Sequence, residues 1–482
     1  MPVVTSGRSP AFSNPLLARG TWIVLGSAGV LCGVWLWCCW CGFPAIPWND
    51  MRIAPAVALH HGISAYSTAT AGPVSTWTYG PMPLLLLWPA GLASSAIGAI
   101  EIAGAIHIGL TLIALTLTSV YWPAPLEAAT SARDRQIRLA AALLCVLLVR
   151  NETSGYVVYC VDAPGIIFGL LALLTLARRR YWLAAGCAAA AAACKQTLLG
   201  VGLAQFVWLF ATVSPHAAWR HVGRCVLAGS AIAIAAMGYF GIPGLWYVLI
   251  GLPSRFPWAP LLPRISDHAT YLLLHVVLPI LVMLVWRRFF FSRRSPGLLP
   301  AIAFFCALPF SLAAFFKNGG NVNSLHSFWF WFPPTLILVT TGKSFARLGH
   351  LGCLALAVAT LVLASLWLQI SVLPVLPSVQ AYREATYLAA RLPGKIWFPT
   401  QPLVTLYSDG RLYHDLDGLR VRTIAGQTIT DEHFFAYIPA KRQATATLLP
   451  IGWGWAGPGE ARLPPDTPTM TFGLWQIDGR LR

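Results

Sequence analysis

The chain has 482 residues, of which 57% are hydrophobic and only 10% are charged, and its mean hydropathy is +0.66. Soluble domains carry about 25% charged residues, so this chain has too little charge to cover a globular surface. The composition excludes a soluble enzyme, a disordered chain and a collagen-like chain, and it predicts a membrane protein with many spans.

The net charge of +17 would indicate a nucleic-acid partner in a soluble protein. Its distribution argues against that partner. Residues before 372 hold 22 Lys and Arg against seven Asp and Glu, whereas the remaining residues hold 11 against nine. The excess therefore lies in short connections between apolar segments, which is typical of a membrane protein under the positive-inside rule. We expect no nucleic-acid partner.

Apolar runs predict eleven membrane-spanning helices, because a hydrocarbon core about 30 Å thick needs about 20 apolar residues in a helix. The predicted spans fall near 22–40, 100–121, 138–150, 164–178, 182–194, 197–213, 224–242, 269–286, 298–316, 329–341 and 351–371. Arg8 and Arg19 precede the first run with no evident cleavage site, so we expect an uncleaved first span. All 11 cysteines precede residue 354, most inside these runs, where cysteine behaves as a small hydrophobe.

The orientation follows from the basic residues of the connections. With the N-terminus in the cytoplasm, sixteen Lys and Arg fall inside: Arg8, Arg19, Arg133, Arg135, Arg138, Arg178, Arg179, Arg180, Arg220, Arg224, Arg287, Arg288, Arg293, Arg294, Lys343 and Arg347. Six fall outside: Arg52, Arg150, Lys195, Arg255, Arg264 and Lys317. This asymmetry predicts a multi-pass protein of the plasma (inner) membrane with an extracytoplasmic C-terminus.

Two long outer loops and a C-terminal domain complete the predicted organisation. The first loop, 41–99, holds a short interfacial helix at 53–61 and a Pro-broken apolar segment at 82–97 that we interpret as re-entrant or interfacial; the second loop spans 243–268. Residues 1–371 form the transmembrane module. Residues 372–482 form a small soluble α/β domain, with a helix at 377–392 followed by short segments separated by turn signals.

An ordered set of polar motifs marks the outer loops. It comprises Asn49-Asp50 after the first span, Tyr79-Gly80-Pro81 at the close of the first loop, Asp162-Ala163-Pro164 after the third span, and Lys195-Gln196 at the outer end of the fifth. This set resembles the C-type (GT-C) membrane glycosyltransferases, in particular the branch of protein O-mannosyltransferases and lipid A aminoarabinose transferases. The resemblance covers residues 20 to about 371. It implies an all-α polytopic GT-C fold that uses a polyprenyl-phosphate sugar as donor and a lipid, glycan or protein as acceptor.

Asp50 is the candidate general base. Glycosyl transfer needs a base that takes the proton from the acceptor, and Asp50 is the only acid of the first outer loop. A single carboxylate suits direct, inverting displacement. The alternative is that Asp50 caps a helix beginning near Met51, and the two roles are not exclusive.

Four cations are candidate partners of the donor phosphate: Lys195, Arg255, Arg264 and Lys317. Arg offers a bidentate fork to phosphate. The alternative for Lys195 is that it extends to the membrane surface. For the two arginines the alternative is interfacial anchoring to anionic lipid.

Further polar residues of the outer face are candidate substrate-binding residues: Asn49, Arg52, Tyr79, Glu152, Asp162, Gln196, His268, Asn321 and Asn323. Ordinary structural roles compete with several of these assignments. Glu152 can pair with Arg150, the loop at 317–323 can be a simple turn, and His268 can be merely interfacial. No histidine has metal-ligand spacing, so no metal residue is assigned, and a divalent cation requirement stays open.

The main alternative function is a secondary transporter or flippase of lipid-linked substrates, which predicts paired broken helices and ionisable groups near the midplane. An oligosaccharide ligase and a non-catalytic scaffold are further alternatives. The chain has no Walker A loop, no dinucleotide fingerprint and no HExxH motif, which argues against nucleotide-driven transport and soluble nucleotide-sugar chemistry.

Overall fold

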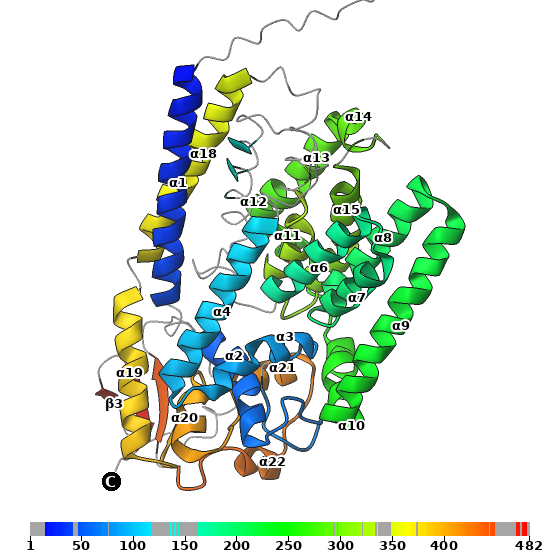
Figure 1. Ribbon diagram of the computed structural model, residues 1–482. Helices are drawn as coiled ribbons and strands as arrows, with labels where there is room; N and C mark the ends of the chain where they lie inside the picture. Colours follow the sequence, from blue (N-terminus) through cyan, green and yellow to red (C-terminus); the bar gives the residue numbers. More distant parts are fainter. Residues whose placement is uncertain are drawn as a thin grey trace, which may run out of the picture.

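The structure is a computed structural model. It describes residues 15–41, 47–75, 77–117, 135–136, 139–140, 143, 162–292, 295, 297–320, 322–332, 335, 349–372, 375–442, 444–448, 469–472 and 475–479. Long helices run roughly side by side, and a mixed region of short helices and strands packs at one end (Figure 1). We call this end of the bundle, which carries residues 47–95 and the C-terminal region, the docking end.

The helices of the bundle coincide with nine of the eleven predicted spans. They are α1 (Pro15–Cys41), α4 (Ala96–Thr116), α6 (Asp162–Ala177), α7 (Tyr181–Ala192), α8 (Leu199–Thr212), α9 (Pro215–Phe240), α12 (Ala269–Leu272) with η8 (Leu273–Val277) and α13 (Leu278–Val285), α15 (Leu298–Phe315), and α18 (Gly349–Val372). The other two ranges, 138–150 and 329–341, lie largely outside the described residues, as do Glu152 and Asn321.

Helix length and hydropathy support a membrane protein. Within the described residues, four helices are long and apolar enough to cross a membrane, and a fifth crossing results if α11 (Leu261–Asp267) and Ala269–Val285, which are bent by 80°, count as one span. Exposed apolar side chains on these helices, such as Leu227, Ile234 and Val285, are compatible with a surface that faces lipid.

The connections of the bundle contain short helices. They are α2 (Pro47–Ala58), η2 (Leu59–His61), α3 (Met82–Leu87), η3 (Trp88–Leu92), η5 (Gln196–Leu198), α10 (Ile242–Trp246), η6 (Tyr247–Gly251), η7 (Pro253–Arg255), α14 (Arg287–Phe290), η9 (Val322–Leu325) and α16 (His326–Trp329). The first of them begins at Pro47 and not after Asp50, so Asp50 lies inside its first turn.

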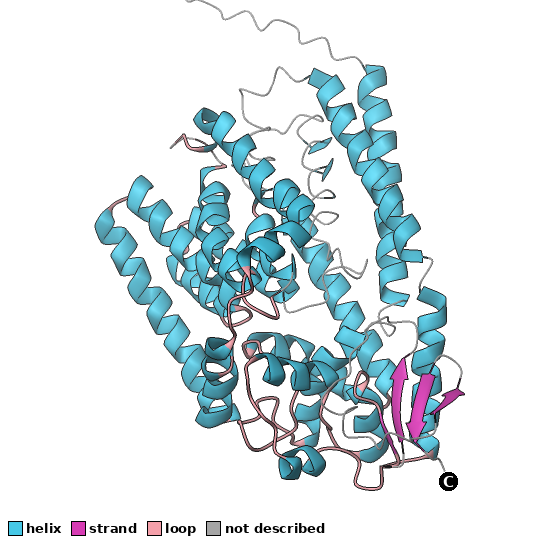
Figure 2. Ribbon diagram, turned by 180° about the vertical axis from the view of Figure 1, so that it is seen from behind, coloured by secondary structure: helices cyan, strands magenta, loops and turns pink. Residues whose placement is uncertain are grey.

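The C-terminal region combines helices with a small sheet (Figure 2). Its helices are α19 (Val375–Arg391), α20 (Pro402–Asp409), α21 (Leu416–Ile424) and α22 (Asp431–Ala436). Its strands are β1 (Ile396–Trp397), β2 (Ala444–Leu448), β3 (Thr469–Phe472) and β4 (Trp475–Gly479), in the order β1-β2-β4-β3. The pair β1–β2 is parallel and the other two pairs are antiparallel.

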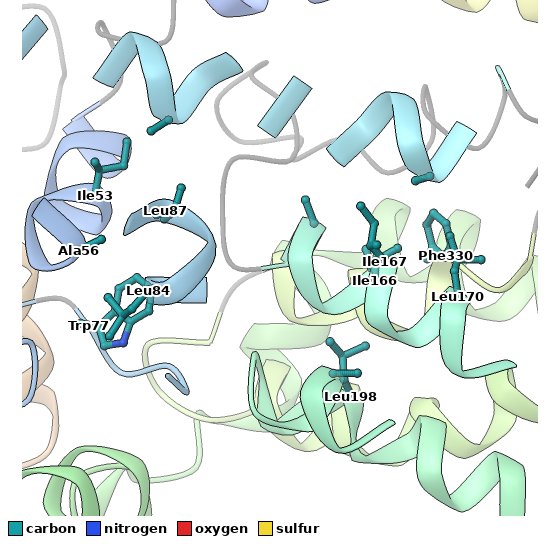
Figure 3. Close-up of a cluster of buried hydrophobic side chains, with 14 of the residues drawn as sticks. Ile53, Ala56, Trp77, Leu84, Leu87, Ile166, Ile167, Leu170, Leu198 and Phe330 are labelled. Carbon is teal, nitrogen blue, oxygen red and sulfur yellow. The ribbon is translucent and has the colours of Figure 1, made fainter. Parts of the chain in front are cut away.

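One large apolar core runs from the first loop into the bundle. Leu84 and Leu87 of α3 lie beside Ile53 of α2, and Trp77 is buried next to them (Figure 3). Two close approaches pin the spans together. A Cβ on Gly165 of α6 would lie 2.2 Å from Leu198 Cδ1, and one on Gly200 would lie 2.5 Å from Ala307 Cα of α15. At Gly200 a methyl group would meet the backbone of α15, so this contact depends on glycine, whereas at Gly165 the nearest atom is the end of the Leu198 side chain.

Candidate functional site

The chain reverses direction at Lys195, inside the length of the bundle. Helix α7 ends at Ala192, Lys195 is extended (φ −151°, ψ 132°), and η5 leads into α8. Leu199, at the start of α8, lines the same groove as Gly229, which is near the middle of α9. Gln196 of the same turn lines this groove together with Leu249 of η6, so the Lys195 turn lies beside both α9 and the segment that follows it.

A buried ionic cluster lies at this turn. Lys195 Nζ lies 2.6 Å from Asp162 Oδ1, and His326 Nδ1 lies 3.5 Å from Asp162 Oδ2. The relative exposures of Asp162, Lys195 and His326 are 3%, 7% and 2%. Lys195 also donates to the Asn323 carbonyl at 3.1 Å. The ammonium group that we predicted for a donor phosphate is thus paired with a carboxylate, and the cluster joins α6, the α7–η5 turn and α16.

An apolar groove lies beside this turn, between α7, α8, α9 and α10. Its volume is about 400 Å³. The walls are mainly small or aliphatic side chains: Ala188, Ala189, Ala192, Ala193, Leu199, Ile232, Ala233, Ala236, Leu245, Leu249 and Ile250, with Gly202 and Gly229. Gln196, Cys225, Gly80 and Pro81 also line it, and Gln196 donates to the Leu249 carbonyl at 3.2 Å. An apolar chain is the ligand that such walls suit best.

Asp50 lies at the contact between the first loop and the C-terminal region. Its carboxylate is fully buried, accepts the Tyr382 hydroxyl proton at Oδ2 (2.7 Å) and accepts the Leu403 backbone N–H at Oδ1 (2.8 Å). Burial raises the pKa of Asp50 to about 7, although both hydrogen bonds act to lower it. The carboxylate therefore caps the start of α20 and not its own helix.

Two neighbours of Asp50 were also predicted to bind substrate. Asn49 is buried in α2. The Arg52 guanidinium lies between two aromatic rings, 5.2 Å from the centre of Trp48 and 5.7 Å from that of Tyr79. Stacking of this kind holds a guanidinium without neutralising it.

The remaining predicted cations lie in the second loop and the loop after α15. Arg264 donates to the Phe315 carbonyl (3.2 Å) and the Gly320 carbonyl. Lys317 Nζ donates to the Pro253 carbonyl at 2.9 Å. Both side chains thus fasten the two loops to each other.

Arg255 and His268 differ from these fastened cations. The Arg255 side chain is exposed and makes no hydrogen bond or ion pair with any part of the chain that the structure describes, although its backbone N–H donates to the Leu252 carbonyl at 3.1 Å. His268 packs edge-on against the Phe315 ring, with 5.3 Å between ring centres. Arg255 is consequently the predicted phosphate partner that is open to a ligand.

The structure brings together only part of the predicted set. Asp162, Lys195 and the Asn323 backbone meet, whereas Asp50 belongs to a separate contact with the C-terminal region. Sequence reasoning missed His326 and Tyr382. An ionisable residue entering an apolar run could have indicated His326. Nothing in the sequence around Tyr382 indicates its contact with Asp50. Across the described ranges, no three His, Cys, Asp or Glu side chains are grouped so as to hold a metal ion.

Comparison with protein-family models, with curated proteins and with solved structures finds no match to this chain.

Proposed function

We propose that the chain is an integral membrane glycosyltransferase that transfers a sugar from a polyprenyl-phosphate donor to a lipid, glycan or protein acceptor at the outer face of the membrane. The observation that carries this proposal is the apolar groove between α7, α8, α9 and α10, which runs up to the Lys195 turn. A lipid-linked donor needs both elements, an apolar channel for its chain and polar groups where the channel meets the loops.

The proposed topology follows the basic residues. Arg178 follows the end of α6, Arg287 begins α14, and Arg220 lies near the start of α9, which begins earlier than the predicted span. Figure 1 places α14 and the start of α9 at the end of the bundle away from the C-terminal region. With that end in the cytoplasm, the eleven predicted spans put residues 372–482 outside as an extracytoplasmic domain.

The proposed chemistry assigns separate roles to a carboxylate and to cations. With a pKa of about 7, Asp50 is suited to accept a proton near neutral pH. Its oxygens are engaged by Tyr382 and Leu403, so the proposal requires that α19 and α20 withdraw before it acts. Arg255 is the proposed first contact of the donor phosphate because it is exposed, whereas the charge of Lys195 is already balanced by Asp162.

A second candidate, a transporter or flippase of lipid-linked substrates, is favoured by one specific observation. Asp162, Lys195 and His326 form a buried ionisable cluster at a helix break, and transporters build coupling-ion sites at such breaks. Flux of a lipid-linked sugar across liposomes without any transfer product would favour this candidate.

Occlusion of the groove tests the role of the lipid chain. The Gly229→Phe substitution places a ring in the groove, where a Cβ meets nothing within 4 Å. Gly223→Phe on the same helix is the matched control, because Gly223 is also open but does not line the groove. Binding of radiolabelled polyprenyl phosphate to protein in nanodiscs should weaken about tenfold or more, or at least 1.4 kcal/mol, in Gly229→Phe only. Equal binding by both variants would remove the groove from the proposal.

A further inference from the structure

The C-terminal region makes several hydrogen bonds to one segment of the first loop. The segment comprises residues 67–75 and 77–82, and we call it the strap. Arg422 of α21 is the largest contributor: it donates to the Thr68 carbonyl (2.8 Å), the Ser67 hydroxyl (3.0 Å) and the Ala69 carbonyl (3.1 Å). A buried guanidinium with three acceptors in one short turn fixes that turn tightly.

Arg422 also reaches the second loop. Its guanidinium carbon lies 4.6 Å from the centre of the Tyr247 ring, and the Tyr247 hydroxyl donates to the Gln427 side chain. Arg422 is 2% exposed. One side chain of the C-terminal region therefore contacts both long loops.

The middle of the strap is held at Val74. Its N–H donates to His414 Nδ1 at 2.8 Å, and its carbonyl accepts the Asp415 N–H at 3.0 Å. The Val74 side chain is fully buried in a small cluster with Trp397, Tyr413, Leu419, Phe434 and Ile438. Gly418 packs closely against the backbone of Ser75, the residue after Val74: a Cβ on Gly418 would lie 2.5 Å from the Ser75 carbonyl carbon.

The other end of the strap is bonded to the Lys195 turn. The Gly80 N–H donates to the Cys194 carbonyl and the Met82 N–H to the Ala193 carbonyl, both at 3.3 Å. A Cβ on Gly80 would lie 1.8 Å from the Ala193 oxygen, so the backbones meet with no room for a side chain. Between the two ends, the Tyr66 hydroxyl donates to the Tyr79 carbonyl and accepts from Trp77 Nε1.

We infer that the strap is a mechanical connection through which the C-terminal region sets the packing over the Asp162–Lys195–His326 cluster, with Arg422 as its positioning residue. The connection has two anchors: Arg422 and Asp415 bind the strap at residues 67–74, and Gly80 and Met82 bind Cys194 and Ala193 just before Lys195. On this inference, a change in the docking of the C-terminal region moves the strap and thereby the turn that carries Lys195. This inference does not depend on the proposed function, because it concerns the chain alone.

Amide hydrogen exchange on the full chain in nanodiscs tests the connection. Arg422→Ala should speed exchange in residues 67–75 and also at the amides of Gly80 and Met82, by about tenfold or more, because local opening governs exchange there. Arg383→Ala is the control, since Arg383 is an exposed arginine of α19. Faster exchange confined to residues 67–75 would show that Arg422 acts only locally and would overturn the inference.

A second variant, at the Gly80 end of the strap, keeps the test valid if Arg422→Ala fails to fold. Gly80→Ala forces the strap away from Ala193 and changes no residue of the C-terminal region. Since coupling between two sites is reciprocal, this variant should speed exchange at the amides of Val74 and Asp415. Unchanged exchange at both amides, with Gly80 and Met82 deprotected, would contradict a connection through the strap.

Discussion

Asp50 and Leu403 lie 353 positions apart in the chain, yet Asp50 Oδ1 accepts the Leu403 backbone N–H at 2.8 Å. Helix α20 begins with Pro402 and has no side-chain cap from its own N-cap residue, Gln401. Asp50 of α2 supplies the missing acceptor and also binds the Tyr382 hydroxyl. A buried carboxylate of the first loop therefore fastens two helices of the C-terminal region.

Loss of this carboxylate should loosen the C-terminal region. Asp50→Ala leaves the Leu403 N–H and the Tyr382 hydroxyl buried without their acceptor, which costs about 1–3 kcal/mol for each unsatisfied group. We expect faster proteolysis within residues 375–448 and a lower denaturation midpoint in detergent. Asp267→Ala, which removes an exposed carboxylate, should leave both measurements unchanged. Matching behaviour of the two variants would contradict the fastening role.

The stability of the folded chain should fall as the pH rises toward neutrality, because burial disfavours the ionised form of Asp50. The folded-state pKa of Asp50 is about 7, above the ordinary value of 3.8. A raised carboxyl pKa contributes stability that is complete below 3.8 and is lost as pH rises through 7. The melting temperature of the wild type should therefore fall relative to that of Asp50→Asn between pH 5 and 8. A constant difference in melting temperature between the wild type and Asp50→Asn from pH 5 to 8 would show that Asp50 does not titrate in this range.

His414 should produce the opposite dependence. Its Nδ1 accepts the Val74 N–H, so this nitrogen carries no proton, and burial lowers the pKa of His414 to about 3. The stability contribution is complete above 6.5 and is lost as pH falls from 6.5 toward 3. His414→Gln offers a non-titrating acceptor to Val74. Below pH 6 the wild type should lose stability relative to this variant, as measured by hydrogen exchange at Val74, and an equal loss in both would reject the assignment.

The Lys195–Asp162 pair should behave as one unit. Removal of one partner of a buried ion pair costs about 3–5 kcal/mol, whereas replacement of both by apolar groups of similar size is often nearly neutral. Lys195→Met alone should thus destabilise the bundle in detergent, and Lys195→Met with Asp162→Leu should recover most of the loss. A double variant as unstable as the sum of the single ones would show that the two charges act independently.

The positions of the helices follow from sequence patterns far better than their contacts do. Apolar runs predicted the ranges of α1, α4, α9 and α15, because lipid and core both demand long apolar helices. The pairing of Lys195 with Asp162 joins the start of α6 to the turn after α7, and periodicity does not reveal such a tertiary contact. The Asp50 contacts involve residues more than 330 positions away, and local sequence carries no signal for them.

Sidedness can be measured independently of any activity. The basic connections predict a cytoplasmic residue 290 and an extracytoplasmic residue 430. Because Phe290 is buried, one cysteine is placed at the neighbouring exposed Ser292 and the other at the exposed Thr430. In intact cells only the cysteine at 430 should react with a membrane-impermeant maleimide, whereas both should react in permeabilised cells. A background without the reactive native cysteines is the control. Labelling of both positions from the same side would contradict the eleven-span topology.

Sugar transfer by purified protein in proteoliposomes is the most direct measurement of the proposed function, with labelled polyprenyl-phosphate hexose as donor and membrane extract as the source of acceptors. General-base catalysis typically contributes about 10²–10⁴-fold. Asp50→Asn keeps an oxygen for the Leu403 N–H and an amide that can donate to the Tyr382 hydroxyl, so it preserves the docking while it removes the base. Tyr382→Phe is the matched control, because it removes one contact and leaves the carboxylate. We predict transfer by the wild type, a loss of that order in Asp50→Asn and near-normal transfer in Tyr382→Phe. Equal transfer by the wild type and Asp50→Asn would contradict the base assignment, and no transfer by the wild type with any donor would contradict the function itself.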